Sequence, residues 1–317
     1  MPVQRDFSQY FTAVQATAPV QNTTKKVNYT VENLFKPTFK NGTAEVIMRF
    51  LPSHPSEFKP FIENRTHMYQ FAEGKWFGCD CLEKYGTTCP ICDYNHKLYT
   101  CGKFTKEEAR PLRLPNARRR FIANVLIVKN DNAPDTEGQV YRFEFGVQIM
   151  DMIRNAWQGY DDPEEGHVDG FNPFDWKTGA NFIYNGVQGA MGPKLDKSRF
   201  GKQRPISDKT GREYTAAEID EIESKLYTLD EYERKLEDSK SYDEIVAYYR
   251  QKTGKSLFGV IDGDSPSLDA QPATNFINAS KPAVQESVVD AVKSTAAPAA
   301  PAASTESEDD FFASLEK

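Results

Sequence analysis

The chain has 317 residues, enough for one large domain or two modest ones. No apolar run approaches the ~18 residues that a membrane-spanning helix needs, so the sequence excludes a membrane protein. Residues 25–205 carry 26 Lys+Arg against 22 Asp+Glu, a net charge of +4, whereas residues 206–317 carry 12 against 23, a net charge of −11. The body of the chain is therefore mildly basic, and its C-terminal third is strongly acidic.

Residues 1–26 have the composition of a short N-terminal arm. Phe7, Tyr10, Phe11 and Val14 recur at helical spacing, which predicts a small amphipathic helix. Two interpretations remain open for it. The helix packs on its own domain, or it docks on a partner.

From residue 27 the pattern changes to β. The segment 44–51 is a strong strand that Pro52 stops, and Asn41-Gly42 just before it is a turn signal. Two further runs, which begin at Phe61 and Lys75, predict strands that lead to a cluster of histidine and cysteine residues.

All five cysteines of the chain and two of its four histidines lie in one short segment. Cys89 and Cys92 form a C-P-x-C sequence, in which both sulfurs can face one ion. His67 offers a third ligand, and either Cys79 or Cys81 offers a fourth, because alternate side chains of an extended segment share a face. One His and three Cys close a tetrahedral Zn²⁺ site of the structural kind. We therefore predict one structural zinc ion.

Three other chemistries fit the cysteine segment less well. A C-x-x-C redox pair opens a helix just after a strand, whereas this one lies in a stretch that we interpret as a loop. A zinc deaminase needs H-x-E and P-C-x-x-C, but Met68 and Tyr69 follow His67, and Thr88 precedes Cys89. Disulfides are not expected, because the opening residues lack the pattern of a signal peptide and the cysteine count is odd.

A hairpin is predicted after a polar segment, 101–117, that we interpret as a loop. The run 118–129 (RRRFIANVLIVK) is the best strand in the sequence, and the run 140–145 (VYRFEF) returns after a turn-rich connection. Arg118, Arg119 and Arg120 place three guanidinium groups in a row on the first strand.

This hairpin has the two ingredients of single-stranded nucleic-acid binding. Cationic groups follow phosphates, and aromatic faces stack on bases at about 1–3 kcal/mol per base. Arg118–Arg120 lie beside Phe121, and Tyr141, Phe143 and Phe145 alternate on the second strand. The alternative is that these three aromatic residues are simply the core face of the strand, and period-2 alternation does not decide between the two.

Residues 147–205 show fewer secondary-structure signals. The segment 147–157 has helical spacing, and 180–184 is one more short strand. A basic run follows this strand, at Lys194, Lys197, Arg199, Lys202 and Arg204.

Residues 215–252 predict two helices. Thr215 and Glu218 have the spacing of a capping box, and Gly254 ends the second helix. An apolar stripe follows the cap at Ile219, Ile222, Leu226 and Leu229.

Residues 259–317 are expected to be disordered, because they are rich in Ala, Pro and Ser and end in an acidic sequence, ESEDDFFASLEK. Such a terminus is a solvated tail, a mobile interaction motif or a mimic of the nucleic-acid backbone.

We find no P-loop, no G-x-S-x-G and no H-E-x-x-H, so the sequence indicates a binding protein and not an enzyme. Short strands with turn signals and few helices predict a mainly β, α+β fold built on a small Greek-key barrel.

Taken in order, several motifs resemble one family: the single-stranded DNA-binding (helix-destabilising) proteins of T-even and related tailed phages. They are AEVIMRFLPS (44–53), GKW (74–76), CPIC (89–92), FIANVLIVKNDNAPDTEGQVYRFEFG (121–146) and GANFIY (179–184). The resemblance implies an OB-fold barrel with an inserted zinc-binding subdomain at about 63–101. It also implies a cleft lined by aromatic and basic side chains, a helical part at about 213–254, and an acidic tail that competes with DNA for the cleft.

Carried over by position, the zinc ligands are His67, Cys81, Cys89 and Cys92, with Cys79 as the alternate to Cys81. The distance from Trp76 favours Cys81, and the distance to Cys89 favours Cys79. The implied DNA contacts are Arg118, Arg119, Arg120, Phe121, Arg142, Phe143, Phe182, Tyr184 and Tyr99.

The resemblance also implies partners and a setting. In the tail, Asp309, Asp310, Phe311 and Phe312 would bind replication and recombination proteins. A core of residues 27–258 would coat single-stranded DNA during phage replication, recombination and repair, in the cytoplasm of the infected bacterium. The arm departs from the family pattern, because only Arg5 precedes Lys25-Lys26, so self-association on DNA would use Phe7 and its neighbours instead. An RNA-binding translational repressor and a scaffold that acts through its acidic tail are the alternatives.

Overall fold

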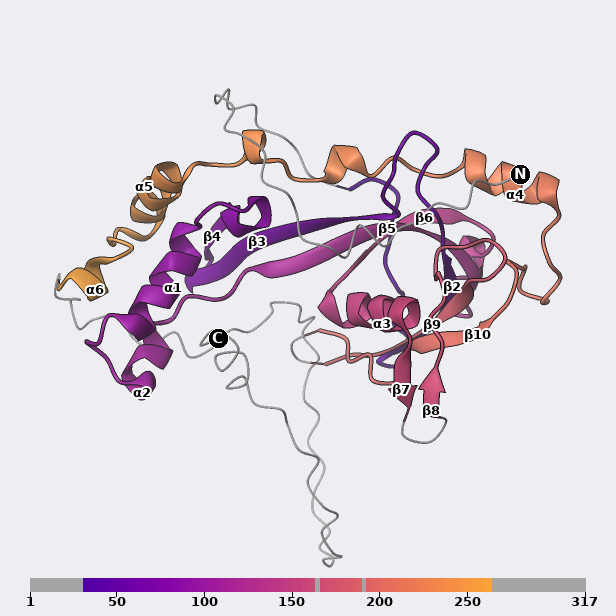
Figure 1. Ribbon diagram of the computed structural model, residues 1–317, viewed down its shortest axis with the longest axis horizontal. Helices are drawn as coiled ribbons and strands as arrows, with labels where there is room; N and C mark the ends of the chain where they lie inside the picture. The colour runs from indigo at the N-terminus through magenta and orange to yellow at the C-terminus, as the bar shows by residue number, and fades with distance from the viewer. Residues whose placement is uncertain (1–30, 163–165, 190–191, 264–317) are drawn as a thin grey trace, which may run out of the picture. The chain divides into compact units, whose positions relative to one another are not determined.

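The structure is a computed structural model that describes residues 31–162, 166–189 and 192–263. Eight strands form one sheet (Figure 1). They are β1 (Leu34–Phe35), β2 (Thr43–Phe50), β3 (Phe61–Ala72), β4 (Lys75–Asp80), β5 (Arg118–Lys129), β6 (Val140–Phe145), β9 (Ala180–Val187) and β10 (Arg199–Gln203). A separate hairpin is made of β7 (Tyr160–Asp162) and β8 (Gly166–Val168).

The α-helices are α1 (Pro90–Thr100), α2 (Lys106–Ala109), α3 (Val147–Gln158), α4 (Ala216–Ser224), α5 (Tyr242–Thr253) and α6 (Gly259–Asp262). Short 3-10 turns are η2 (Leu82–Tyr85), η3 (Arg110–Leu112), η4 (Pro134–Thr136), η5 (Asp230–Tyr232) and η6 (Leu236–Asp238). Among the described residues, no helix is both long enough and apolar enough to cross a membrane.

The strands are hydrogen-bonded in the order β1-β6-β5-β2-β9-β10, with β3 paired to β5 and β4 paired to β3. Only the short β1–β6 pair is parallel. This confirms a mixed α+β fold with a large sheet. The path ends at β1 and β10, which do not pair with each other within the described ranges, so a closed OB-fold barrel is not confirmed.

The first core lies against the C-terminal half of β5. Side chains of a strand alternate between its faces, and Phe121, Ala123, Val125 and Ile127 point to one buried face. Phe50 of β2 is at the centre, and its ring contacts five other aromatic rings at centroid distances of 5.6–6.5 Å. Those rings belong to Phe143, Phe145, Phe174, Phe182 and Phe200.

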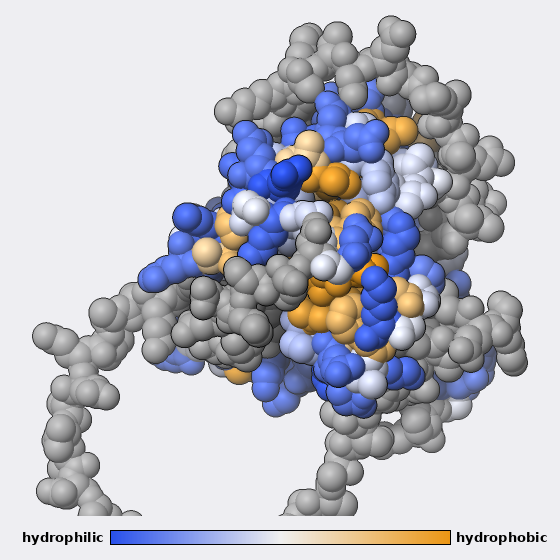
Figure 2. Space-filling model, turned by 90° about the vertical axis from the view of Figure 1, so that its left-hand side faces the viewer, coloured by the Kyte–Doolittle hydropathy of each residue, from blue (hydrophilic) through white to orange (hydrophobic). Residues whose placement is uncertain are grey.

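A second core forms where β3 runs beyond β5 and pairs with β4. Its buried residues come from β3, β4 and α1, but also from α5 and α6, where Ile245, Tyr249 and Ile261 contribute. Figure 2 views the left-hand side of Figure 1, where α1, α2, α5 and α6 are drawn, and shows apolar residues gathered among hydrophilic ones. The two C-terminal helices therefore belong to the unit that contains the cysteines.

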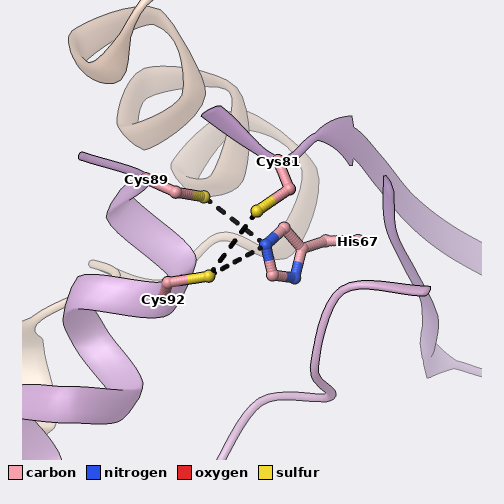
Figure 3. A group of neighbouring side chains, drawn as sticks. All are labelled: His67, Cys81, Cys89 and Cys92. Carbon is pink, nitrogen blue, oxygen red and sulfur yellow. Dashed lines mark hydrogen bonds between the residues drawn. The ribbon is translucent and has the colours of Figure 1, made fainter. Parts of the chain in front are cut away.

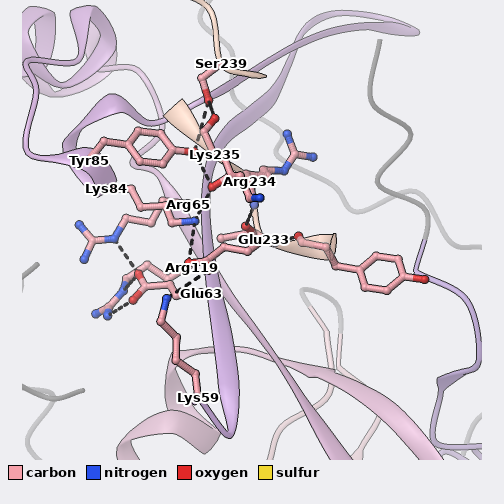
Figure 4. Close-up of polar contacts among 12 residues, drawn as sticks. Lys59, Glu63, Arg65, Lys84, Tyr85, Arg119, Glu233, Arg234, Lys235 and Ser239 are labelled. Carbon is pink, nitrogen blue, oxygen red and sulfur yellow. Dashed lines mark hydrogen bonds and ion pairs between the residues drawn. The ribbon is translucent and has the colours of Figure 1, made fainter. Parts of the chain in front are cut away.

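Residues 225–241, which we term the connecting segment, join α4 to α5 across one face of the sheet, where they hydrogen-bond to Asn64 of β3 and Asn124 of β5. Figure 4 shows the part of this segment at Glu233 and Arg234. The carboxylate of Glu57 accepts the backbone N–H groups of Leu229 and Asp230, at 2.7 and 2.9 Å. Arg234 forms an ion pair of 2.6 Å with Asp80 at the end of β4. The connecting segment is thus bonded both to the loop after β2 and to the second core.

The helix signals in the C-terminal part are confirmed at both ends of the region. Thr215 and Glu218 form the capping box of α4, and Gly254 ends α5 in the left-handed conformation, at φ 72°. The apolar stripe is wrong in part, because α4 ends at Ser224 and Leu226 and Leu229 are buried outside any α-helix. The predicted loop at 101–117 is also wrong in part, since it contains α2 and η3.

Candidate metal centre and nucleic-acid interface

The C-P-x-C sequence begins a helix, so our interpretation of this stretch as a loop is wrong. Cys89 is the N-cap of α1, and Pro90 occupies the first turn, where its missing N–H costs no hydrogen bond. The backbone N–H of Asp93 donates to the carbonyl of Cys89 at 2.8 Å. One helical turn therefore holds Cys89 and Cys92 on the same side of α1.

Four side chains converge beside this turn. The donor atoms of His67, Cys81, Cys89 and Cys92 all lie within 4.8 Å of one another. Sγ of Cys89 and Sγ of Cys92 are 3.4 and 3.5 Å from Nε2 of His67, and Sγ of Cys81 is 3.7 Å from Sγ of Cys92. Figure 3 shows the four side chains turned toward one another from β3, from the start of η2 and from α1.

These separations fit a tetrahedral metal ion. Metal–sulfur and metal–nitrogen bonds of about 2.3 and 2.0–2.1 Å imply sulfur–sulfur edges of about 3.8 Å and sulfur–nitrogen edges of about 3.6 Å. The three distances given above agree with these edges. Three thiols and one imidazole also suit a soft or borderline cation better than Ca²⁺ or Mg²⁺, which prefer oxygen ligands.

The electrostatics of the cluster favour a thiolate at Cys89, whereas hydrogen bonds with Cys81 and Cys89 raise the pKa of the Cys92 thiol. Burial alone lowers the pKa of His67, but hydrogen bonds to Cys81 and Cys89 and their charges raise it to about 10. Hydrogen bonds from Cys81 and Cys92 lower the pKa of the Cys89 thiol. The cluster therefore stabilises a positive charge among its sulfurs, and a bound cation would take the place of the imidazole proton. Nδ1 of His67 lies 3.3 Å from the carbonyl of Pro115, which orients the ring.

Cys79 and Cys101 lie outside the cluster. Cys81 follows the last residue of β4, and its N–H donates to the carbonyl of Arg65 at 3.0 Å. Burial raises the pKa of the Cys79 thiol, and Cys79 is not among the four residues whose donor atoms converge. Cys101 is the C-cap of α1, at the opposite end of the helix from Cys89. The geometry thus selects Cys81 and not Cys79.

A second group of functional side chains lies where β3 pairs with β5. Arg65 is opposite Arg119, and Thr66 is opposite Arg118. Arg118 and Arg120 are exposed, whereas Arg65 and Arg119 on the other face are half-buried. We term these four residues the arginine ribbon (Arg65, Arg118, Arg119 and Arg120).

One carboxylate partly neutralises the arginine ribbon (Figure 4). Glu63 accepts hydrogen bonds from Nε of Arg65 at 2.7 Å and from Nε and Nη2 of Arg119 at 2.7 and 3.0 Å. Burial raises the pKa of Glu63, but these two arginines lower it by more, so the carboxylate stays charged. Arg120 has only a long contact of 3.8 Å with Glu144, and no ion pair of Arg118 is found among the described residues. The ribbon therefore keeps a net positive charge.

The aromatic residues expected at the DNA surface are buried in this structure. Phe121, Phe143, Phe182 and Tyr184 all belong to the first core and have exposed fractions of 3% or less. Their shared strand faces point at Phe50, which explains the burial. The alternative interpretation of Tyr141, Phe143 and Phe145 as a core face fits this structure, because Phe143 and Phe145 are buried and Tyr141 packs partly buried against the same core. Tyr99 is half-buried beside the second core.

Arg142, another expected DNA contact, is buried between two tyrosine rings. Its guanidinium lies 4.5 Å from the ring centres of Tyr227 and Tyr232. It also donates to the carbonyls of Glu32 and Thr228 and forms an ion pair of 2.8 Å with Glu231. In this structure Arg142 therefore anchors the connecting segment to β6.

Two groups that belong to these sites were not predicted from the sequence. Arg65 joins the arginine ribbon, and its place in a β run two residues before His67 was an available signal. The carbonyl of Pro115 has no such signal, because any residue supplies a carbonyl. Asp309, Asp310, Phe311 and Phe312 lie outside the described residues.

Comparisons with known proteins bear on this geometry. A family described as "gp32 DNA binding protein like" matches residues 40–251, well over half of the chain. The single-stranded DNA-binding proteins of Enterobacteria phages T2 and T4 are each 29% identical over 221 residues. The aligned part is 69% of this chain and 68% and 69% of those proteins, respectively. The matched range contains the metal cluster and the arginine ribbon, and it confirms the resemblance inferred from the motifs: the chain belongs to the gp32 DNA binding protein like family.

Proposed function

We propose that the chain binds single-stranded DNA with little sequence preference and performs no catalysis. Membership of the gp32 DNA binding protein like family, with two relatives named single-stranded DNA-binding proteins, carries this proposal. The arginine ribbon supports it, because a cationic strand pair offers phosphates a row of donors. A cluster with four protein ligands leaves no position for a reacting water, so it gives no reason to expect an enzyme.

In the binding mechanism, exposed Arg118 and Arg120 hold phosphates first. Arg119 and Arg65 add to the local positive charge, although both share Glu63. Tyr99, half-buried beside the second core, is the proposed aromatic contact to a base. Phe121, Phe143, Phe182 and Tyr184 act indirectly, because their packing fixes the strands that carry the arginines.

The metal is proposed to be one Zn²⁺, held by His67, Cys81, Cys89 and Cys92 in a structural role. Three thiols and an imidazole at tetrahedral separations support this identity. The zinc would join α1 to β3 through His67 and thereby set the position of the second core. We further propose that the first core is an OB-fold, within a DNA-binding core at residues 27–258.

We also propose a biological setting and two terminal functions. The protein would coat single-stranded DNA during phage replication, recombination and repair, in the cytoplasm of the infected bacterium. The acidic tail within residues 259–317 would recruit replication and recombination proteins, and the arm at 1–26 would mediate self-association on DNA. The net charge of −11 over residues 206–317 supports competition between the tail and DNA.

Titration with (dT)₁₆ at several salt concentrations tests the main proposal. We expect binding whose log–log slope against salt is about −0.7 for each phosphate neutralised. Binding to duplex DNA of the same length should be much weaker, and matched (rU)₁₆ separates a DNA-binding from an RNA-binding protein. Salt-independent binding, or equal affinity for duplex DNA, would refute the proposal.

Deletion of residues 304–317 tests the tail. This segment contains four acidic residues in ESEDD, and a tethered polyanion competes locally for a cationic surface. We expect the truncated chain to bind (dT)₁₆ more tightly, most clearly at low salt. A variant with Phe311 and Phe312 replaced by Ser keeps the charge and serves as the control. An unchanged affinity after truncation would remove the competition mechanism.

A further inference from the structure

The hairpin of β3 and β4 has one buried face and one solvated face. His67, Tyr69 and Phe77 point to the buried side, toward the metal cluster and α5. On the opposite side Met68 and Trp76 are 46% and 48% exposed. The solvated face of an antiparallel sheet usually carries polar residues. Two large apolar side chains at neighbouring positions therefore need an explanation.

The strand register puts the two side chains on one surface. Met68 is opposite Gly78, and Gln70 is opposite Trp76. Gly78 has no side chain, and Cε of Met68 lies 3.5 Å from the place where a Cβ of residue 78 would be. Met68 thus lies over the glycine beside Trp76. No ring stacking or cation–π contact of Trp76 is found among the described residues, so its indole face is available to a ligand.

The same sheet face continues to the exposed arginines. Paired residues share a face, and so do residues two apart on one strand. Thr66 is opposite Arg118, and Asn64 is opposite Arg120, so both arginines lie on the Met68–Trp76 side. Four residues along β3 and two strand spacings separate the backbones of Arg118 and Trp76 by about 16 Å. Two acidic residues on this face have cationic partners: Asp80 pairs with Arg234 at 2.6 Å, and Glu144, opposite Ile122, lies 3.8 Å from Arg120.

We propose that Trp76 stacks a base of the bound single strand, on a path whose phosphates are held by Arg118 and Arg120. Met68 completes the apolar surface beneath that base. This inference rests on the proposed function and extends it, because it adds the outer face of the β3–β4 hairpin to the DNA-binding surface. The combination of an exposed indole and two exposed guanidinium groups on one side of a sheet fits a nucleic-acid strand.

The first test compares Trp76→Ala and Trp76→Phe with the unchanged protein in titrations with (dT)₁₆. We expect Trp76→Ala to weaken binding by roughly 5- to 150-fold, the range for loss of one stacked base. Trp76→Phe retains an aromatic ring and should restore most of the affinity. Tyr160→Ala removes an exposed aromatic residue on β7 and is the matched control, with an affinity within about 2-fold of the unchanged protein.

A second measurement does not depend on a variant that folds. Of the three tryptophans, Trp176 is buried and Trp157 is half-buried, so acrylamide should quench mainly Trp76. Saturation with (dT)₁₆ is expected to protect this fluorescence from acrylamide. The inference would be overturned if the protein binds (dT)₁₆ tightly but the fluorescence stays unprotected and Trp76→Ala binds with full affinity. The proposed function would then remain intact. No binding of (dT)₁₆ by the unchanged protein would instead refute the proposed function.

Discussion

Replacing Cys81 with serine is expected to release the metal ion and unfold the second core, whereas the same replacement of Cys79 should preserve both. The two cysteines are two residues apart, yet only Cys81 belongs to the four-ligand cluster. Metal content per chain, measured by atomic spectroscopy, and thermal unfolding followed by circular dichroism are the readouts. Equal metal loss in the two variants would contradict the assignment of Cys81.

The large expected effect follows from where the ligands come from. His67 lies on β3, Cys81 precedes η2, and Cys89 and Cys92 begin α1, so one bound ion would join three elements. Apparent binding free energies of about 10–16 kcal/mol for structural zinc equal or exceed the whole stability of a typical domain. His67 and Cys89 are fully buried, and without the ion their polar atoms would face a poorly packed interior.

Cys101→Ser provides a second control for the metal assignment, because Cys101 lies at the far end of α1. A strong chelator added to the unchanged protein should reproduce the Cys81→Ser result, and Zn²⁺ added in excess should reverse it. If the chelated protein keeps its thermal transition, the metal does not hold the second core together.

Local sequence patterns correctly predicted those strands and helix ends that depend on neighbouring residues along the chain. The strand β5, the returning strand β6 and the capping box of Thr215 and Glu218 follow from alternation and cap spacing. The helix at Cys89 was missed even though Pro90 and Asp93 in its first turn are helix-start signals.

The site was harder to predict. The alternation of residues along a strand shows which side chains share a face, but it does not show which of the two faces is buried. Phe121, Phe143 and Tyr184 were expected to be available to bases, but the strands turn them into the first core. That choice depends on packing between β2, β5, β6 and β9, which are far apart in the sequence. The burial of Arg142 is also nonlocal, since Tyr227 and Tyr232 approach it from the connecting segment.

Arg118 and Arg142 were both expected to contact DNA, but in the structure Arg118 is exposed and Arg142 is buried. Arg142→Ala is expected to destabilise the fold by about 2–4 kcal/mol, because it removes two cation–π contacts and leaves buried carbonyls without donors. Arg118→Ala should leave the stability within about 0.5 kcal/mol, since Arg118 is exposed and no ion pair of it is found among the described residues. Urea unfolding of both variants checks this difference.

For DNA binding we expect the opposite order: the Arg118 substitution should have the larger effect, and the Arg142 substitution the smaller one. Arg118→Ala is expected to weaken binding of (dT)₁₆ and reduce the salt slope by about 0.7, the effect of one lost phosphate contact. Folded Arg142→Ala, held well below its unfolding transition, should bind with the affinity and salt slope of the unchanged protein. If it instead loses both while it stays folded, Arg142 must leave the tyrosine pair to bind phosphate. The connecting segment would then have to move when DNA binds, because Arg142 anchors it to β6 through Glu231 and the carbonyl of Thr228.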